Sequence, residues 1–487
     1  MRVRAWLPTM LLLYAFVDPR GASAQNIRGG EQVPRLEQGS CPFEARAWAQ
    51  AVRLECRYLI VPQHRDRVGA TIRLPVAILR AQQQATKPPV VILHGGPGLS
   101  ALVPMLPGIA QSGISQDRDV VLYDQRGAGL STPVLCPEFR VPPVTDYSDA
   151  GRGAMRDQLR ACVQSLRAKG VDLAAYSTAA SADDLYDLRR ALRYEMWDVF
   201  GESYGGRLAQ EAIRRDSAGI RAVVLSSPTI VGPGRAEAAA TFEHAFTRVS
   251  ESCKANSACN AAFPTFVDDF HALFSEFEQA PLAFTADTTT GSATITLDGE
   301  QVGELVRRML RAPSNIAFLP LILHEMRSGD RLRAARELFR RGARVRVLSA
   351  TFFLVECNDQ YGPTFESVLA SVTRTTPATF RQRMDLECDV WQTSFAPDGS
   401  REPVRSSIPT LIVTGQFDPV APPEWGRRIA ATLSRAVVIE VPGESHEQPS
   451  RCRTRIVAQF LSDPYGRLDD SCVARMPPVA FASRWPS

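Results

Sequence analysis

The chain has 487 residues, 45% of them hydrophobic and 22% charged, and a formal net charge of +4 at pH 7. This length suits one large core with an insertion, or two domains, and excludes a minimal module. So balanced a charge does not favour nucleic acid as a partner. After the N-terminal segment, no run of about 20 apolar residues predicts a membrane span.

The N-terminal segment has the pattern of an export signal. Arg2 and Arg4 begin it, a short apolar stretch runs to Val17, and residues 22–24 (ASA) fit a small-residue cleavage site. The apolar stretch is too short to span a bilayer comfortably. We therefore expect residues 1–24 to be a signal peptide, and the mature protein to be secreted or periplasmic.

Ten cysteines in an exported chain favour disulfides, because thiols that leave the cytosol meet oxidising conditions. Pairing cysteines that are close in sequence gives Cys41–Cys56, Cys136–Cys162, Cys253–Cys259, Cys357–Cys388 and Cys452–Cys472. The alternative is that several are simply small buried hydrophobic residues. No CxxC, HExxH or paired Cys/His spacing predicts a metal site, and we expect no cofactor.

Two early segments, Cys56–Val61 and Ile72–Leu79, alternate enough to predict an antiparallel lead-in. Short, nearly continuous apolar runs follow, which are typical of strands buried on both faces. These runs are VVILHG near Val90, DVVLYD from Asp119, WDVFG from Trp197, AVVLSS from Ala222, TLIVTG from Thr410 and AVVIEV from Ala436. Helix-like stretches separate them, so the predicted fold class is α/β, with a mostly parallel, doubly wound sheet.

Ser181 and Asp184 give a capping-box pattern that predicts the start of one early helix, ahead of Leu185.

The alternation of strands and helices is interrupted once. After about Val231 the pattern becomes mainly helical, with one hairpin expected at residues 281–299, and an insertion of this length is too long for a loop. The predicted parts are a signal peptide (1–24), a core in two pieces (25–231 and 408–475), a mainly helical cap (232–407) and a tail (476–487).

A candidate nucleophile lies in GESYGG, residues 201–206. Ser203 follows a predicted strand and precedes a predicted helix, and Gly201 and Gly205 leave room for a sharp bend. Such a bend exposes the hydroxyl and directs a helix N-terminus at the site, where developing negative charge is favoured. The alternative is a serine in an ordinary tight turn.

A serine nucleophile needs a base and a group that orients the base. Asp418 and His446 follow the last two predicted strands, and Ser, Asp, His is the chain order of such a triad. The alternatives are a turn aspartate and a surface histidine. For the tetrahedral oxyanion we expect donors from the backbone N–H groups of Gly96, in HGGPG, and Tyr204.

These motifs also carry a resemblance to a known family. The chain resembles the α/β-hydrolase aminopeptidases, meaning prolyl aminopeptidases and the secreted tripeptidyl aminopeptidases, from about Cys56 to Cys472. The matching motifs are HGGPG (94–98), YDQRGAGLSTP (123–133), GESYGG (201–206), GQFDPV (415–420) and GESH (443–446). The resemblance implies an α/β-hydrolase fold with a cap, and it makes Asp124 and Arg126 internal structural partners.

The resemblance also implies peptide substrates with a free N-terminus. An exopeptidase must recognise an α-ammonium, and a shielded carboxylate is its natural partner. FLVECNDQYG suggests the tripeptidyl branch and offers Glu356 and Asp359, while Glu202 lies beside the nucleophile. The alternative for these acids is a structural ion pair or ordinary cap surface.

Three functions remain open at this point. The first is an exported serine aminopeptidase of prolyl or tripeptidyl type that uses a Ser-His-Asp acyl-enzyme mechanism. The second is an esterase or other acyl hydrolase of the same fold. The third is a non-catalytic binding protein that kept the scaffold. None of them implies nucleic acid, a membrane span or an obligate partner.

Overall fold

The computed structural model describes residues 33–44, 47–139, 149–232, 237–288, 291–343, 349–360, 388–391 and 401–486. The expected signal peptide, residues 1–24, lies outside these residues, as do several segments of the expected cap. No helix in the described part of the chain is long and apolar enough to cross a membrane.

Within the described residues, nine strands form one sheet in the order β1-β2-β3-β5-β4-β6-β7-β10-β11. The strands are β1 (Arg35–Gln38), β2 (Arg53–Pro62), β3 (Thr71–Arg80), β4 (Val90–Leu93), β5 (Val120–Tyr123), β6 (Trp197–Glu202), β7 (Ile220–Ser226), β10 (Thr410–Gly415) and β11 (Ala436–Val441). The expected antiparallel lead-in is confirmed: β2 pairs antiparallel with β3, and β3 with β5. From β5 to β11 the neighbouring strands are parallel.

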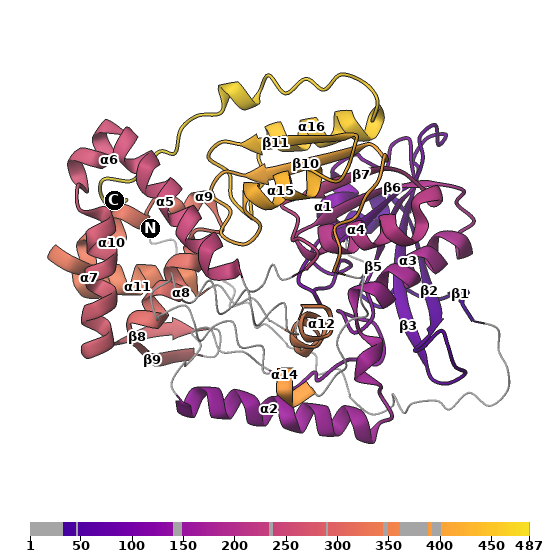
Figure 1. The fold of residues 1–487 in the computed structure, drawn as a ribbon, viewed down its shortest axis with the longest axis horizontal. Helices are drawn as coiled ribbons and strands as arrows, with labels where there is room; N and C mark the ends of the chain where they lie inside the picture. The colour runs from indigo at the N-terminus through magenta and orange to yellow at the C-terminus, as the bar shows by residue number, and fades with distance from the viewer. Residues whose placement is uncertain are drawn as a thin grey trace, which may run out of the picture. The chain divides into compact units, whose positions relative to one another are not determined.

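Helices cover both faces of this sheet, which explains the continuous apolarity of its central strands (Figure 1). One face packs against α2 (Asp149–Ala168), α3 (Thr178–Ala191), α4 (Tyr204–Asp216) and α15 (Pro423–Ala430). The other packs against α1 (Leu106–Gln111) and α16 (Arg451–Ser462). The predicted mostly parallel, doubly wound α/β class is therefore confirmed.

The predicted capping box at Ser181 and Asp184 is wrong. Helix α3 begins earlier, and its N-cap is Ser177, whose side chain accepts from the backbone N–H of Ala180. Asp184 instead lies inside the helix, fully buried, and forms an ion pair with Arg126. The short polar pattern resembled a helix cap, but the side chain of Asp184 pairs with Arg126, which lies 58 residues away in the chain.

Between β7 and β10 the described residues are mainly helical, with the hairpin expected at residues 281–299 now confirmed as β8 (Leu282–Thr288) and β9 (Gly291–Leu297). The helices are α5 (Ala238–Ala255), α6 (Ser257–Ala262), α7 (Phe266–Gln279), α8 (Gly299–Met309), α9 (Pro313–Ile316), α10 (Leu319–Ser328), α11 (Arg331–Gly342), α12 (Ala350–Gln360) and α14 (Cys388–Trp391). Helices α5 to α11 contribute to a second hydrophobic core, rich in phenylalanine.

Helices α12 and α14 depart from this arrangement. Their buried residues, among them Phe352, Leu354 and Trp391, belong to the core of the sheet and not to the phenylalanine-rich second core. The insertion predicted as one cap is thus divided between two cores. Its apolar patterning did not reveal this division, because burial against either core requires the same residue types.

All five expected disulfides are confirmed: Cys41–Cys56, Cys136–Cys162, Cys253–Cys259, Cys357–Cys388 and Cys452–Cys472. Each pair has its Cα atoms between 5.1 and 5.8 Å apart, as disulfide geometry requires. Cys357–Cys388 joins α12 to α14 and so ties together the two helices that pack on the sheet.

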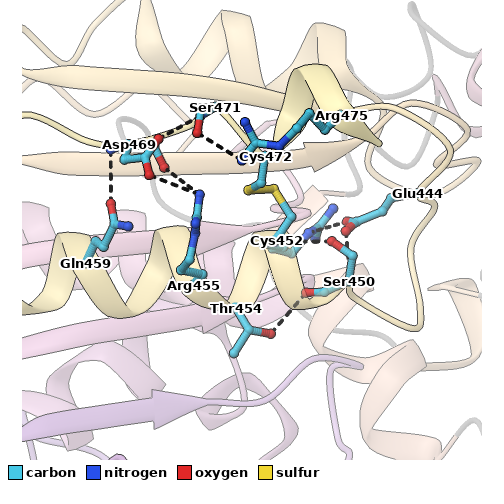
Figure 2. The surroundings of a disulfide bond; sticks show 11 residues. Glu444, Ser450, Cys452, Thr454, Arg455, Gln459, Asp469, Ser471, Cys472 and Arg475 are labelled. Carbon is cyan, nitrogen blue, oxygen red and sulfur yellow. Dashed lines mark hydrogen bonds and ion pairs between the residues drawn. A yellow bond between two sulfur atoms is a disulfide. The ribbon is translucent and has the colours of Figure 1, made fainter. Parts of the chain in front are cut away.

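The last of these bonds anchors the chain after α16. Cys472 bonds back to Cys452 on the helix, and Asp469 pairs with Arg455 at 3.2 Å and donates its N–H to Gln459 (Figure 2). From there residues 463–486, which we name the C-terminal strap, reach the second core. Phe481 and Trp485 pack against that core, and the Ala482 N–H donates to the Ala317 carbonyl at 2.8 Å. The strap therefore connects the sheet to the helical insertion.

Opening the Cys452–Cys472 bond should loosen this connection. For the double change Cys452→Ser and Cys472→Ser, we expect a loss of about 3 kcal/mol in unfolding free energy in urea, because the loop that it closes spans 20 residues. Limited proteolysis should then cut the C-terminal strap first. The matched control is Cys253→Ser with Cys259→Ser, whose loop of 6 residues predicts about 2 kcal/mol and no change at the strap. A strap equally protected in both variants would contradict the anchoring role.

Candidate active site

Ser203 lies at a strained bend between β6 and α4. Its φ of 56° and ψ of −120° are unusual for a residue with a side chain. The bend is possible because a Cβ on Gly205 would lie 2.1 Å from the Leu93 carbonyl oxygen, and one on Gly201 would lie 2.3 Å from the carbonyl oxygen of Gly205. Only glycine fits at these two positions, as the GxSxG spacing predicted.

A chain of hydrogen bonds runs from Ser203 to Asp418. The Ser203 Oγ lies 3.0 Å from His446 Nε2, and His446 Nδ1 lies 2.8 and 3.0 Å from the two carboxylate oxygens of Asp418. Because an ionised carboxylate only accepts, Nδ1 carries the proton and Nε2 is left to accept from the serine. The structure thus brings together three predicted residues that are up to 243 positions apart.

The environment of Asp418 keeps it ionised. The side chain is fully buried, which alone would oppose ionisation. The His446 imidazole and the N–H groups of Ala421 and Val420, both at 2.8 Å, nevertheless hold the pKa of Asp418 below its usual value. The carboxylate can therefore orient the imidazole and stabilise its positive charge.

The glycine loop after β4 closes over Ser203. A Cβ on Gly95 would lie 2.9 Å from the Ser203 Cβ and 3.3 Å from its Oγ, so this glycine contacts the serine directly. Gly96 has a φ of +120°, and the contacts of its own Cβ position are with Gly98 and Leu99. HGGPG offers two adjacent glycines, and the sequence alone does not indicate that Gly95 is the one in contact with the serine side chain.

Tyr204 is the first residue of α4, where backbone N–H groups have no intrahelical partner. Its N–H therefore lies beside the nucleophile, at the positive end of a helix. The candidate donors at Gly96 and Tyr204 remain a prediction, with Gly95 as the glycine nearest to the serine.

The turn after β5 holds the segment that follows the glycine loop through hydrogen bonds. Asp124 accepts from the Ser100 hydroxyl and from the N–H groups of Ala101 and Leu130, at 2.7 to 2.8 Å. Arg126 is almost fully buried and pairs with Asp184 at 2.6 Å. Both residues are therefore internal partners, as the resemblance implied.

The loop that carries His446 is held on both sides by the segment between α8 and α9. Ser445 donates its hydroxyl to the Leu310 carbonyl and, at 3.1 Å, to that of Phe417. Glu447 donates its N–H to the Arg311 carbonyl and pairs with the Arg311 guanidinium, both at 2.8 Å. The insertion thus fixes the residues on either side of the imidazole.

A second buried pair lies behind this loop and was not foreseen from the sequence. Glu444 lies 2.5 Å from Arg453 and accepts from the Ser450 N–H at 2.8 Å. Arg453 also donates to the hydroxyl of Ser226, at the end of β7. The sequence signal that could have indicated this pair is the glutamate two residues before the histidine in GESH. The pair of Glu444 and Arg453 connects the loop to α16.

A family model described as "alpha/beta hydrolase fold" matches residues 88–448, about three quarters of the chain. The chain belongs to the α/β-hydrolase fold family. Its Ser203, Asp418 and His446 all lie within the matched range.

The curated proteins and solved structures that this chain resembles carry different names. The chain is 30% identical over 287 residues to carboxylesterase B of Mycobacterium tuberculosis, covering 53% of this chain and 55% of that protein. It is 26% identical over 145 residues to a proline iminopeptidase of Heyndrickxia coagulans, covering 30% and 36%. The chain thus spans about half or less of the length of the curated relatives it matches. The proline iminopeptidase structure from Mycobacterium smegmatis matches with a TM-score of 0.40 and 16% identity, covering 84% of this chain and 98% of that one.

The structure places the three candidate amine-binding acids in different surroundings. Glu356 and Asp359 both face Arg207, at 2.7 and 3.3 Å, and all three side chains are buried or nearly so. Burial raises the pKa of Asp359 to about 6, although Arg207 and Thr178 oppose that rise. Because both carboxylates already serve Arg207, these contacts favour the structural ion pair that the sequence left open, not amine binding.

Glu202 is placed differently. It is half-buried at the end of β6, directly before Ser203. Glu202 is in register with Ser226 of the neighbouring parallel strand β7, so the two side chains lie on the same face of the sheet.

Among the residues described, no group of three or more His, Cys, Asp or Glu side chains is arranged to hold a metal ion.

Proposed function

We propose that this α/β-hydrolase is an exported serine aminopeptidase that releases residues or short peptides from free N-termini, of prolyl or tripeptidyl type. The observation that carries the proposal is the chain of hydrogen bonds from Ser203 through His446 to Asp418. A Ser-His-Asp triad at the ends of three strands, with its aspartate and histidine buried, is suited to acyl transfer.

In the proposed reaction, Ser203 Oγ attacks the carbonyl carbon of the scissile bond while His446 Nε2 takes its proton. The carbonyl oxygen becomes an oxyanion, and the backbone N–H groups of Gly96 and Tyr204 are the proposed donors to it. His446 then protonates the leaving amine, and the C–N bond breaks to leave an ester on Ser203. Water, activated by the same imidazole, hydrolyses that ester and restores the serine hydroxyl.

For the substrate ammonium we propose Glu202 as the partner. In an enzyme that removes single residues, the ammonium lies only two bonds from the scissile carbonyl, so its carboxylate must lie near the nucleophile. Glu202 is the residue before Ser203 and is half-buried. Glu356 and Asp359 are less suited, because both carboxylates already contact the Arg207 guanidinium.

We expect Glu202→Gln to raise KM for free-amine peptides about tenfold, since losing one charge-assisted hydrogen bond costs about 1.5 kcal/mol. Hydrolysis of 4-nitrophenyl butyrate, which has no amine, should keep its KM. Glu195→Gln, at an exposed position before the same strand, is the control and should change neither substrate. An equal change in KM for peptide and ester would remove Glu202 from the proposed role.

Export is proposed on two grounds. The first is the signal pattern in residues 1–24, and the second is the pairing of all ten cysteines in disulfides, which form in oxidising compartments. Both a secreted and a periplasmic location fit this proposal.

The test of the function is a panel of 4-nitroanilides of Pro, Ala and Ala-Ala-Pro, each with a free and with an acetylated N-terminus. Turnover of the free forms at least about 100-fold faster than the acetylated forms is the expected result. Equal turnover of both forms would contradict an aminopeptidase.

An esterase is the second candidate, and two observations favour it. The acids expected to bind an amine in the cap are paired with Arg207, and the relative at 30% identity is named carboxylesterase B. Rapid hydrolysis of short-chain 4-nitrophenyl esters with no turnover of any free-amine peptide would decide for this candidate.

A further inference from the structure

Helix α12 is a buried helix that joins the two sides of the candidate oxyanion site. Its residues from Ala350 to Asn358 are all buried, and its apolar ones belong to the core of the sheet. A helix that is apolar on every side is one surrounded by protein. The few polar residues on α12 therefore need partners. Asn358 donates to the carbonyls of Leu173 and Tyr176, whereas Thr351 and Glu356 contact elements on either side of Ser203.

The N-terminal end of α12 contacts the glycine loop and the turn after β5. Thr351 is 1% exposed and donates its hydroxyl to the Gly127 carbonyl. A Cβ on Gly98 would lie 2.3 Å from Ser349 Oγ and 2.9 Å from Thr351 Cβ, so the backbone of the HGGPG loop rests directly on this helix end. The loop that supplies Gly95 and Gly96 is held between α12 and Ser203.

The C-terminal half of α12 reaches Tyr204. Asp359 accepts from the Thr178 N–H at 3.0 Å and from its hydroxyl, which lies 2.9 Å from the Tyr204 hydroxyl. Arg207, paired with Glu356 and Asp359, has its guanidinium carbon 4.7 Å from the centre of the Tyr204 ring. Helix α12 therefore holds Thr178, which contacts the Tyr204 hydroxyl, and Arg207, which contacts the Tyr204 ring.

We propose that α12 is a brace that sets the positions of both oxyanion donors, with Glu356 and Asp359 as positioning residues that act on Tyr204 through Arg207 and Thr178. Thr351 acts in the same way on the glycine loop. The inference rests on the proposed function, because it needs an oxyanion to form at Ser203.

The cost of burying these charged groups favours a positioning role for Glu356 and Asp359 over a role in stability alone. A buried ion pair is weak evidence for stability, since removing charges from water costs about as much as their attraction returns. The guanidinium is 4% exposed and its two carboxylates are 6% and 12% exposed, so their desolvation is substantial. Fixed positions of the oxyanion donors increase the rate of the reaction, because losing one donor lowers kcat by about 10²–10³-fold.

The test compares Glu356→Gln and Asp359→Asn with the unchanged protein on 4-nitrophenyl butyrate, which carries no amine. We expect kcat to fall 10- to 100-fold with less than a twofold change in KM. Binding of an alkyl boronic acid, whose tetrahedral adduct places an oxygen where the oxyanion forms, should weaken by the same factor. Loss of transition-state stabilisation alone produces this pattern.

The control is Asp216→Asn. This change breaks the buried ion pair of Arg189 and Asp216, whose two hydrogen bonds are both 2.7 Å long. The pair joins α3 to α4 at the opposite end of α4 from Tyr204. We expect this change to lower the midpoint of thermal unfolding without lowering kcat. Equal losses of kcat in the control and the α12 variants would overturn the brace.

Tyr204→Phe gives a second test that removes only the hydroxyl and keeps the ring in place. We expect a 3- to 10-fold fall in kcat at unchanged KM, even if the α12 variants fail to fold. Unchanged kcat in Tyr204→Phe, or a rise in KM limited to free-amine peptides in Asp359→Asn, would overturn the proposal. Failure of a fluorophosphonate to label the unchanged protein would instead overturn the proposed function, and the brace with it.

Discussion

Replacing Ser203 with alanine is expected to lower kcat/KM by about 10⁴- to 10⁶-fold for every substrate that the protein hydrolyses. The reason is that the acyl-enzyme route ends when the nucleophile is removed, and only the oxyanion donors and binding contacts remain. Initial rates with 4-nitrophenyl butyrate, at enzyme concentrations high enough to detect the residual rate, measure the effect.

The control for Ser203→Ala is Ser181→Ala. Ser181 is also buried but lies within α3, outside the hydrogen-bonded chain. It should keep its kcat/KM within about twofold, and the thermal unfolding of both variants should stay close to that of the unchanged protein. A Ser203→Ala variant that retains more than a hundredth of the activity would show that another group is the nucleophile.

Asp418→Asn is expected to lower kcat by about 10³- to 10⁴-fold. An amide at this position no longer fixes the imidazole tautomer that leaves Nε2 free to accept from Ser203, and it no longer stabilises the imidazolium. The His446 Nδ1 at 2.8 Å from Asp418 is the contact that carries this prediction. The geometry of the site should survive, because the amide is close in shape to the carboxylate.

The chain offers a matched control in His64 and Asp172. Their side chains also form a His–Asp pair, at 2.7 Å, but Asp172 is 37% exposed and neither residue contacts Ser203 in the described structure. Asp172→Asn should leave kcat unchanged. Equal losses of kcat in the two variants would contradict a specific role for Asp418.

Asp418 also predicts a dependence of stability on pH. Its pKa is lower in the folded protein than its usual value of about 3.9, so the ionised carboxylate stabilises the fold above that pH. That contribution is lost as the pH falls through the folded pKa. The difference in unfolding free energy between the unchanged protein and Asp418→Asn should therefore be larger at pH 7 than at pH 3.

The elements that the sequence predicted correctly are those defined by local pattern. Strands buried on both faces are continuous in apolarity, and the glycines at positions 201 and 205 are required by contacts shorter than any Cβ allows. Asp418 and His446 were found because both follow short apolar runs, and parallel strands bring their carboxyl ends to one edge. The second of these runs, β11, is an edge strand and only partly buried, in contrast to the prediction that it is covered on both faces. Disulfide partners were found because each pair is close in sequence.

The features that the sequence did not predict depend on partners far along the chain. Asp184 matched a cap, but its partner Arg126 lies 58 positions away. For Glu356 and Asp359 the sequence left an amine site and a structural ion pair both open, because the Arg207 that they contact lies 149 and 152 positions away. A carboxylate has the same sequence signature whether a substrate or an arginine neutralises it, so only the folded arrangement separates the two.

The role of Ser203 as a nucleophile activated by His446 is measured by treating the folded protein with diisopropyl fluorophosphate and mapping the adduct by mass spectrometry of peptides. We expect one adduct, on the peptide that contains Ser203, and its loss in His446→Ala, because the hydroxyl 3.0 Å from that imidazole is then no longer activated. An adduct on a different residue, or no adduct on the folded protein, would contradict that role.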